Sequence, residues 1–161
     1  MNLHQGYLPG CIGRIAQLHA AFYSAAVGFG ANFEAKVAKE LSDFCLNYTA
    51  QRDGLWLATA GEQIEGSIAI DGAHYSERGA HLRWFITSDK TRGSGVGTRL
   101  LHAALDFCAT KAYSNVYLWT FDELHAARHL YEKYGFRLAR SQPGSQWGTE
   151  VNEQLFIRNE A

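Results

Sequence analysis

The protein has 161 residues, of which 47% are hydrophobic, and its 15 Lys and Arg residues nearly balance its 16 Asp and Glu residues. A chain of this size and hydrophobic content can bury the core of one globular domain, so we expect a single domain over residues 1–161. The near-neutral charge and the absence of a basic run exclude nucleic acid and anionic membrane surfaces as expected partners. The three cysteines are widely spread and form no Cys-x-x-Cys pair, which is typical of reduced thiols in a cytoplasmic protein.

The segment 12–30 is apolar enough to raise the question of a signal peptide or a membrane span. Arg14, Gln17 and His19 interrupt it, and no run approaches the ~18 apolar residues of a membrane-spanning helix. We therefore expect a buried helix here and no membrane association.

Hydrophobic periodicity predicts two helices and then three strands in the first half of the chain. Apolar residues recur at three- and four-residue spacing over 12–26 and again over 33–48, which is typical of helices with one buried face. Apolar runs predict strands over 55–60, 63–70 and 80–87, the first two joined by a tight turn.

The second half alternates between helices and strands. Helical spacing of apolar residues appears over 96–108 and over 124–134. The predicted strands cover residues 116–120, 136–140 and 151–158. Pro143-Gly144 predicts a turn between the last two strands. No repeat or linker interrupts the order, which indicates an α+β fold.

A glycine-rich run, Arg92-Gly93-Ser94-Gly95-Val96-Gly97-Thr98, connects the strand 80–87 to the helix 96–108. Alternating glycines let the backbone approach a ligand without obstruction by a Cβ atom. The unpaired N–H groups at the start of the helix point toward such a ligand, and the helix dipole favours an anion. The run therefore predicts a loop that binds phosphate, although a flexible helix start without a ligand stays open as the alternative.

Three known kinds of glycine loop have patterns similar to this run. A P-loop needs a lysine followed by Ser or Thr, whereas Thr98 is followed by Arg99. A dinucleotide-binding fingerprint needs a different glycine spacing and an acidic residue where Tyr113 stands. The run instead resembles Arg/Gln-x-x-Gly-x-Gly/Ala, the pyrophosphate loop of the GNAT superfamily of acetyl-CoA-dependent N-acetyltransferases.

A second motif lies about 30 residues further along the chain. The segment 127–136, Ala-Arg-His-Leu-Tyr-Glu-Lys-Tyr-Gly-Phe, resembles the other GNAT signature, A-x-x-L-Y-E-K-x-G-F. Gly135 ends the helix, because glycine readily takes the left-handed conformation of a helix cap. One departure is Leu124, which stands where the family usually has asparagine. Both motifs in this order make the resemblance specific.

The resemblance implies the GNAT fold, a central mixed and mostly antiparallel sheet with flanking helices. It also implies acetyl-CoA as co-substrate and no metal ion. In the family, backbone groups of the strand before the loop hold the thioester, here Phe85, Ile86 and Thr87, and a local bulge frees them for this. The loop would hold the pyrophosphate through Arg92, Gly93, Ser94, Gly95, Val96, Gly97 and Thr98.

The resemblance also implies two catalytic roles. Tyr131 matches the tyrosine that typically protonates the departing thiolate, and a phenol with a pKa of ~10 keeps its proton at neutral pH; the alternative is that Tyr131 only packs. The amine needs a base, for which we select Glu34, with His19, His81 and Glu153 as further candidates. Each of these could equally be a solvated or core side chain, and bulk water could take the proton.

The sequence thus predicts an enzyme that transfers the acetyl group of acetyl-CoA directly, in a ternary complex, to a primary amine. The acceptor is expected to be a small molecule, an amino acid or a peptide. An acyl-CoA sensor or a nucleotide-binding interaction module without catalysis stays open as the alternative. The sequence does not decide between a monomer and a homodimer.

Two further patterns in the sequence bear on metal binding and on DNA recognition. His125 and His129 have the i, i+4 spacing of a zinc-binding helix, but Ala126 replaces the glutamate of a metalloprotease and no third ligand is placed, so we expect no metal. The chain also resembles the acetyltransferase half of proteins that fuse a MarR-type DNA-binding domain to a GNAT domain. The residues that carry this are His19-x-x-x-Tyr23, Phe33-Glu34, Leu118-Trp119-Thr120, Gln146-Trp147-Gly148 and Glu153-Gln154. We expect no DNA recognition, since no segment resembles the DNA-binding half.

Overall fold

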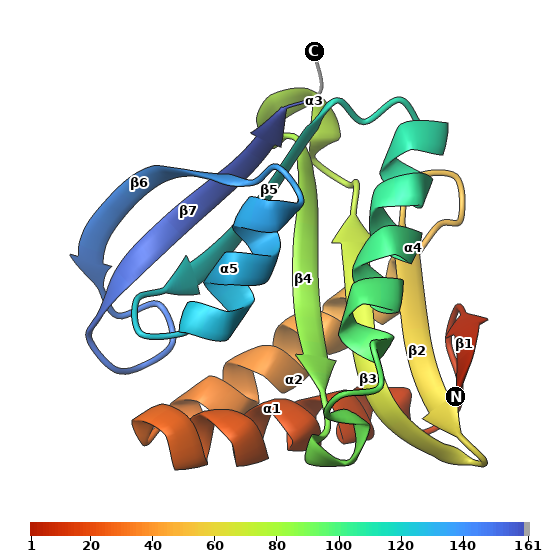
Figure 1. Ribbon diagram of the computed structural model, residues 1–161, viewed down its shortest axis with the longest axis horizontal. Helices are drawn as coiled ribbons and strands as arrows, with labels where there is room; N and C mark the ends of the chain where they lie inside the picture. The colour runs from red at the N-terminus through yellow and green to blue at the C-terminus, as the bar shows by residue number, and fades with distance from the viewer. Residues whose placement is uncertain (160–161) are drawn as a thin grey trace.

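The computed structural model describes residues 1–159, which form a seven-stranded sheet with helices on both faces (Figure 1). The strands are β1 (Asn2–Gln5), β2 (Gly54–Ala60), β3 (Gln63–Asp71), β4 (Ala80–Thr87), β5 (Asn115–Phe121), β6 (Arg137–Gly144) and β7 (Val151–Asn159). The helices are α1 (Cys11–Val27), α2 (Ala31–Leu46), α3 (Tyr75–Arg78), α4 (Val96–Thr110) and α5 (His125–Lys133), with a 3-10 turn over Asp89–Thr91.

The sheet is mixed and mostly antiparallel. Its strand order is β1-β2-β3-β4-β5-β7-β6. Only β4 and β5 pair in parallel, because α4 carries the chain from one end of β4 back to the start of β5. The predicted α+β fold with a mostly antiparallel mixed sheet is confirmed.

The helices form a layer on each face of the sheet. α1 and α2 lie behind it in Figure 1, whereas α4 and α5 lie in front. Each layer has its own hydrophobic cluster, one built on α4 and one on α1 and α2. The sheet is therefore covered on both sides, and β4 in its middle contributes Leu82 to the first cluster and Trp84 to the second.

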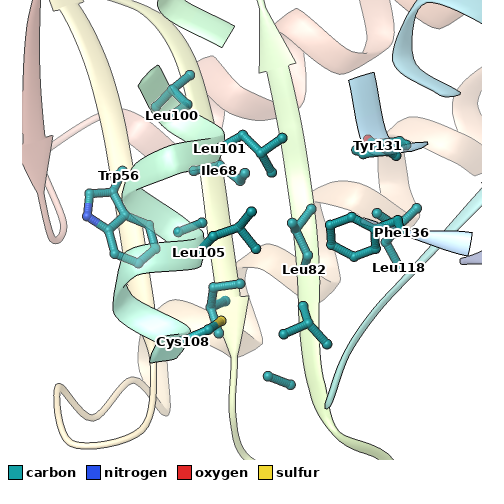
Figure 2. Packing of buried hydrophobic residues seen from close by; sticks show 14 of the residues in the cluster. Trp56, Ile68, Leu82, Leu100, Leu101, Leu105, Cys108, Leu118, Tyr131 and Phe136 are labelled. Carbon is teal, nitrogen blue, oxygen red and sulfur yellow. The ribbon is translucent and has the colours of Figure 1, made fainter. Parts of the chain in front are cut away.

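The cluster under α4 shows why this segment is helical. Its fully or nearly fully buried side chains recur at three- and four-residue spacing: Val96, Leu100, Leu101, Ala104, Leu105 and Cys108. Figure 2 shows the leucines of α4 on one side of Leu82, with Leu118, Phe136 and Tyr131 on the other. The helix and the Tyr131 region are thus packed on the same face of β4.

α1 confirms the expectation of a buried helix at the start of the chain. Its inward face carries Cys11, Ile15, Ala16, Leu18 and His19. Within residues 1–159, no helix is both long and apolar enough to cross a bilayer.

Three details differ from the prediction. β1 and α3 were not predicted, because both are only four residues long and lack a detectable period. The predicted turn at Pro143-Gly144 is wrong, since β6 continues through both residues and pairs Pro143 with Asn152. Proline is tolerated there because β6 is an edge strand, whose outward N–H groups need no partner in the sheet.

Candidate active site

A β-bulge interrupts β4 in the middle of the sheet. Arg83 and Ile86 are three positions apart on β4, whereas the residues they pair with on β3 are two positions apart. Trp84 at the bulge has a φ of 48°, which is unusual for a non-glycine residue. The buried hydroxyl of Ser67 donates a hydrogen bond of 2.7 Å to the Trp84 carbonyl and so stabilises this conformation.

The bulge changes the face to which the side chains of β4 point. Arg83 and Trp84 follow one another, yet both face α2, where Arg83 pairs with Glu40 and Trp84 packs on Phe44 at 5.3 Å between ring centroids. Phe85 then turns to the opposite face, toward the cluster under α4. An extra residue in one strand has this effect because strand side chains alternate with a period of two.

β4 and β5 diverge beyond their first residues. Their register covers only two pairs, Ala80 with Val116 and His81 with Tyr117. Figure 1 shows the two strands separating from there, with α5 in front of β5. From residue 82 onward the backbone of β4 is therefore not paired with β5. Its N–H and C=O groups on this side can bind an extended ligand between the two strands.

The glycine loop presents free backbone amides at the start of α4. Gly93 and Gly95 have φ angles of 78°, the left-handed region that glycine adopts without strain. Within residues 1–159 the amides of Gly97 and Thr98 have no intramolecular acceptor, since the first helical bond runs from Arg99 N to the Gly95 carbonyl. Free amides at a helix N-terminus favour an anion.

A cavity of about 270 Å³ lies over this loop. It is lined by Phe22 of α1, by Thr87, Ser88, Asp89 and Thr91, and by Arg92, Gly93, Gly95, Val96, Gly97 and Thr98. Arg92 is exposed and its guanidinium pairs with Asp89 at 3.0 Å. The Ser94 hydroxyl instead donates to the Thr91 carbonyl at 2.5 Å, so it braces the loop and does not line the cavity.

A second and larger cavity, of about 460 Å³, lies where β4 and β5 separate. Its aromatic lining consists of Tyr23, Phe33, Trp84, Phe85, Tyr117, Trp119, Phe121, Tyr131 and Trp147. Its charged lining consists of Lys36, Glu40, Asp71, Arg78 and Arg83, with His19, His74 and His81 beside them. The two cavities lie at successive parts of β4, the large one lined by Phe85 and the small one by Thr87.

The family model of the acetyltransferase (GNAT) family matches residues 14–136 of the chain. The chain belongs to this GNAT family. The residues that match the family model include β4, the glycine loop and Tyr131, and all three contribute to the lining of the two cavities.

Known acetyltransferases resemble this GNAT protein in sequence and fold. N-acetyltransferase family 8 member 2 of Rattus norvegicus is 26% identical over 110 residues, which cover 66% of this chain and 49% of that protein. An acetyltransferase of the GNAT family from Staphylococcus aureus Mu50 is 17% identical, with a TM-score of 0.76 over 98% of this chain and 99% of the other. The aligned region spans about half the length of the curated relatives that the chain matches.

A third similar protein was solved with a ligand. It is a GNAT family acetyltransferase from Elizabethkingia anophelis with acetyl-CoA bound, 19% identical, with a TM-score of 0.64 over 99% of this chain and 97% of the other. The present chain fits such a co-substrate, because its loop offers unpaired amides and no atom lies within 4 Å of a Cβ added at Gly93 or Gly95. Among residues 1–159 no three potential metal ligands come together.

Tyr131 belongs to α5 and lines the large cavity. It is 7% exposed, and its ring centroid is 6.2 Å from that of Phe85 and 5.9 Å from that of Phe136. Burial raises the pKa of its hydroxyl above the ordinary value, so the phenol is protonated at neutral pH. Within the described residues its hydroxyl has no hydrogen-bond partner, which leaves it available to a ligand in the cavity.

The four candidate bases occupy different environments. His19 and His81 both line the large cavity, whereas Glu34 is exposed in the first turn of α2 and does not line it. Glu153 is buried and accepts hydrogen bonds of 2.9 Å from the amide and the side chain of Gln146, so it holds the loop before β7. The structure thus brings two histidines into the cavity, and neither glutamate.

His19 and His81 are neutral at pH 7. Burial lowers the pKa of His19 to about 4, and its Nδ1–H donates to the Ile15 carbonyl at 2.8 Å. Burial and the nearby cations lower the pKa of His81 well below its ordinary value, and its ring stacks on Tyr117 at 4.4 Å. With Nδ1 of His19 as donor, its Nε2 carries a lone pair that can accept a proton or a hydrogen bond.

Several residues of the large cavity were not predicted from the sequence. His74 precedes the unpredicted α3 and Arg78 ends it, and Glu40 with Arg83 forms an ion pair across two elements. The opposite charges of Glu40 and Arg83, on an expected helix and an expected strand, could have indicated that the two residues pair. The bulge that turns Arg83 toward α2 does not alter the hydrophobic pattern of the sequence. Long-range pairing alone brings these side chains together.

Proposed function

We propose that this GNAT protein is an N-acetyltransferase that moves the acetyl group of acetyl-CoA directly to a primary amine in a ternary complex. The acceptor is a small molecule, an amino acid or a peptide. The observation that carries this proposal is the succession of two cavities along β4, from the free amides beside Gly97 to the bulge at Trp84. A ligand with a phosphate end and a reactive end could occupy both cavities at once.

Acetyl-CoA supplies an activated acetyl group, and the residues of the chain supply position and proton transfer. The loop amides hold the pyrophosphate, with Arg92 nearby. Backbone groups of β4 from Phe85 to Thr87 lie along the diverging edge, where they can bind the carbonyl and the chain that leads to it. The protonated hydroxyl of Tyr131 donates a proton to the thiolate that leaves.

The acceptor amine must lose a proton, for which His19 and His81 are the better-placed residues. Both line the acceptor cavity and both are neutral, so each can accept a proton or pass it to water. Glu34 stays a candidate base only for a proton that has already reached the surface, since its side chain is exposed. Loss of activity in Glu34→Gln with full activity in His19→Asn would reverse this ranking.

The test is a panel of amines incubated with acetyl-CoA, with free thiol and acetylated product followed by mass spectrometry. Thiol release coupled to acetylation of at least one amine supports the proposal. The Gly95→Asp variant is the matched negative control, because aspartate tolerates the left-handed conformation but places a negative charge beside the free amides. It should lose acetyl-CoA binding by calorimetry with an unchanged circular dichroism spectrum.

The main alternative is an acyl-CoA sensor or an interaction module without catalysis. Tight acetyl-CoA binding without thiol release on any amine would favour it. Our proposal includes a single GNAT domain over residues 1–161, similar to the acetyltransferase half of MarR–GNAT fusion proteins, that acts in the cytoplasm as a monomer or homodimer. Sedimentation of the purified chain distinguishes these two states.

A further inference from the structure

The large cavity has a cationic end at the beginning of β4. Three of its lining residues are basic, namely Lys36, Arg78 and Arg83, and two are acidic, namely Glu40 and Asp71. The cavity therefore carries one net positive charge when its histidines are neutral.

The two acids are already neutralised by two of the three bases. Glu40 pairs with Lys36 and with Arg83, and Arg83 also lies 3.8 Å from Asp71. In contrast, Arg78 forms no ion pair with any residue from 1 to 159. Its guanidinium hydrogen-bonds to the Tyr117 side chain, and it is the one charge of this lining, within the described residues, that no acid neutralises.

The groups around Arg78 report the same positive potential. The guanidinium groups of Arg78 and Arg83 and the ammonium of Lys36 add to the effect of burial in lowering the pKa of His81. Burial and, to a smaller extent, the Asp71 carboxylate raise the pKa of Tyr117, and the charges of the same two arginines, with a hydrogen bond from Arg78, oppose this rise. A positive potential of this kind attracts an anionic group and repels a cationic one.

Arg78 and Tyr131 lie at opposite ends of the cavity. Arg78 ends α3 two residues before β4 begins, whereas Phe85, whose ring packs near that of Tyr131, lies near the other end of the strand. Ala80 and Phe85 are five residues apart, so the backbone between them spans about 16 Å at the usual rise of a strand. Even with the arginine side chain extended into the cavity, a bound anion lies several bonds away from an amine at the thioester.

Aromatic rings line the cavity between these two ends. β5 contributes those of Tyr117, Trp119 and Phe121, and β4 and α2 contribute those of Trp84 and Phe33. A methylene chain can pack on such rings without leaving a polar group unpaired.

Resting on the proposed function, we propose that the acceptor is an ω-amino carboxylate, a primary amine separated from a carboxylate by several methylene groups. Arg78 binds the carboxylate, the aromatic rings pack on the chain, and the amine reaches the thioester end beside Tyr131. A guanidinium suits this role because its planar donors match the two oxygens of a carboxylate. Polyamines, which carry a cation at the distal end, are disfavoured.

The test compares three acceptors of equal length that differ only at the distal end. They are ε-aminocaproate with a carboxylate, ε-aminocaproamide with a neutral amide, and hexamethylenediamine with a cation. We expect kcat/KM to decrease in this order. The Arg78→Met variant should lower kcat/KM for the carboxylate by about 10- to 100-fold, the usual value of a charged hydrogen bond, and should leave the amide almost unchanged.

Two further variants keep the result interpretable. Arg78→Lys retains the charge and should recover part of the preference for the carboxylate. Arg137→Met removes an exposed arginine of β6 outside the cavity and should change neither acceptor. Arg78 is exposed, so its variants should keep the wild-type thermal midpoint.

The possible results distinguish a wrong assignment of Arg78 from a wrong proposed function. Equal kcat/KM for the carboxylate and the amide, a preference for the diamine, or equal losses on both acceptors in Arg78→Met would overturn the assignment of Arg78 and of the acceptor class. In those cases acetylation of other amines would leave the proposed function intact. Acetyl-CoA binding without acetylation of any amine would instead refute the proposed function itself.

Discussion

In the proposed reaction, the Tyr131 hydroxyl is the side chain with the most direct chemical role. It is buried, protonated and without an intramolecular partner among residues 1–159, and its ring contacts Phe85 of β4. Its oxygen is not among the fully buried unpaired atoms of the described residues, so the cavity leaves it accessible to a ligand.

The Tyr131→Phe variant should separate binding from chemistry. The change removes one hydroxyl and almost no volume, so folding and acetyl-CoA affinity should be preserved. Loss of a positioned proton donor should lower kcat by roughly 10²–10⁴-fold on an identified acceptor. Steady-state kinetics and calorimetry on the same preparation check this. A wild-type kcat with chemistry shown to limit the rate would assign the tyrosine to packing.

His19 makes the stability of the fold depend on pH. Its folded pKa is about 4, below the ordinary value of 6.5, so the unfolded state binds the proton first as the pH falls. The contribution of the neutral ring to the free energy of unfolding is fully present above pH 6.5 and is lost as the pH falls to about 4. At one pKa unit per 1.36 kcal/mol, this loss is about 3 kcal/mol.

The prediction is tested by urea unfolding of the wild type and His19→Asn across this pH range. The wild type should lose about 3 kcal/mol more than the variant between the two ends, because the variant has no buried imidazole to protonate. His81 and the carboxylates titrate in both proteins and cancel in the comparison. Parallel pH profiles would show that the His19 pKa is not depressed.

At the scale of elements, the glycine loop depends on a buried carboxylate of β3. Glu65 is 2% exposed, accepts a hydrogen bond of 2.9 Å from the Ser88 hydroxyl and pairs with Arg14 of α1 at 2.6 Å. Its carbonyl also accepts from the Ser88 amide at 2.8 Å. Burial disfavours its charge, but the bonds from Ser88 and Arg14 outweigh this and lower its pKa. Glu65 thus fixes the start of the loop to the sheet and to α1.

The Glu65→Gln variant should loosen this attachment. Loss of the charge leaves Arg14 without its ionic partner and should lower the free energy of unfolding by about 1–3 kcal/mol. The KM for acetyl-CoA should rise, while the KM for the acceptor stays constant, because the acceptor cavity does not involve Glu65. Glu62→Gln, an exposed change in the neighbouring turn, is the control. Equal effects on both substrates would mean a general loss of folding.

At the scale of the whole molecule, stability comes from two hydrophobic clusters that share the sheet. Leu101 is completely buried in the cluster under α4, whereas Leu46 at the end of α2 is 84% exposed. Leu101→Ala should lower the free energy of unfolding by about 2–5 kcal/mol, through lost burial and the cavity left behind. Leu46→Ala, the same change at the surface, should stay within about 0.5 kcal/mol of the wild type. Denaturant titration measures both, and equal losses would contradict this division.

Structural features that depend on residues close to one another in the sequence could be predicted from it. The helices α1, α2, α4 and α5 follow from apolar spacing, and the glycine loop follows from residues 92–98 alone. β4 was predicted with its observed bounds, 80–87. Short elements such as β1 and α3 could not be predicted, because four residues show no period and their formation depends on the strand or turn they pack against.

What the sequence by itself determined is the fold class, the family motifs and the place of the glycine loop. These rest on local periods of two and 3.6 residues and on glycine conformation, which act within a few residues. Only the tertiary structure decided which candidates share a cavity: His19 and His81 line it, and Glu34 and Glu153 do not. The physical reason is that the bulge at Trp84 and the divergence of β4 from β5 arise from pairing between distant strands, which no local pattern records.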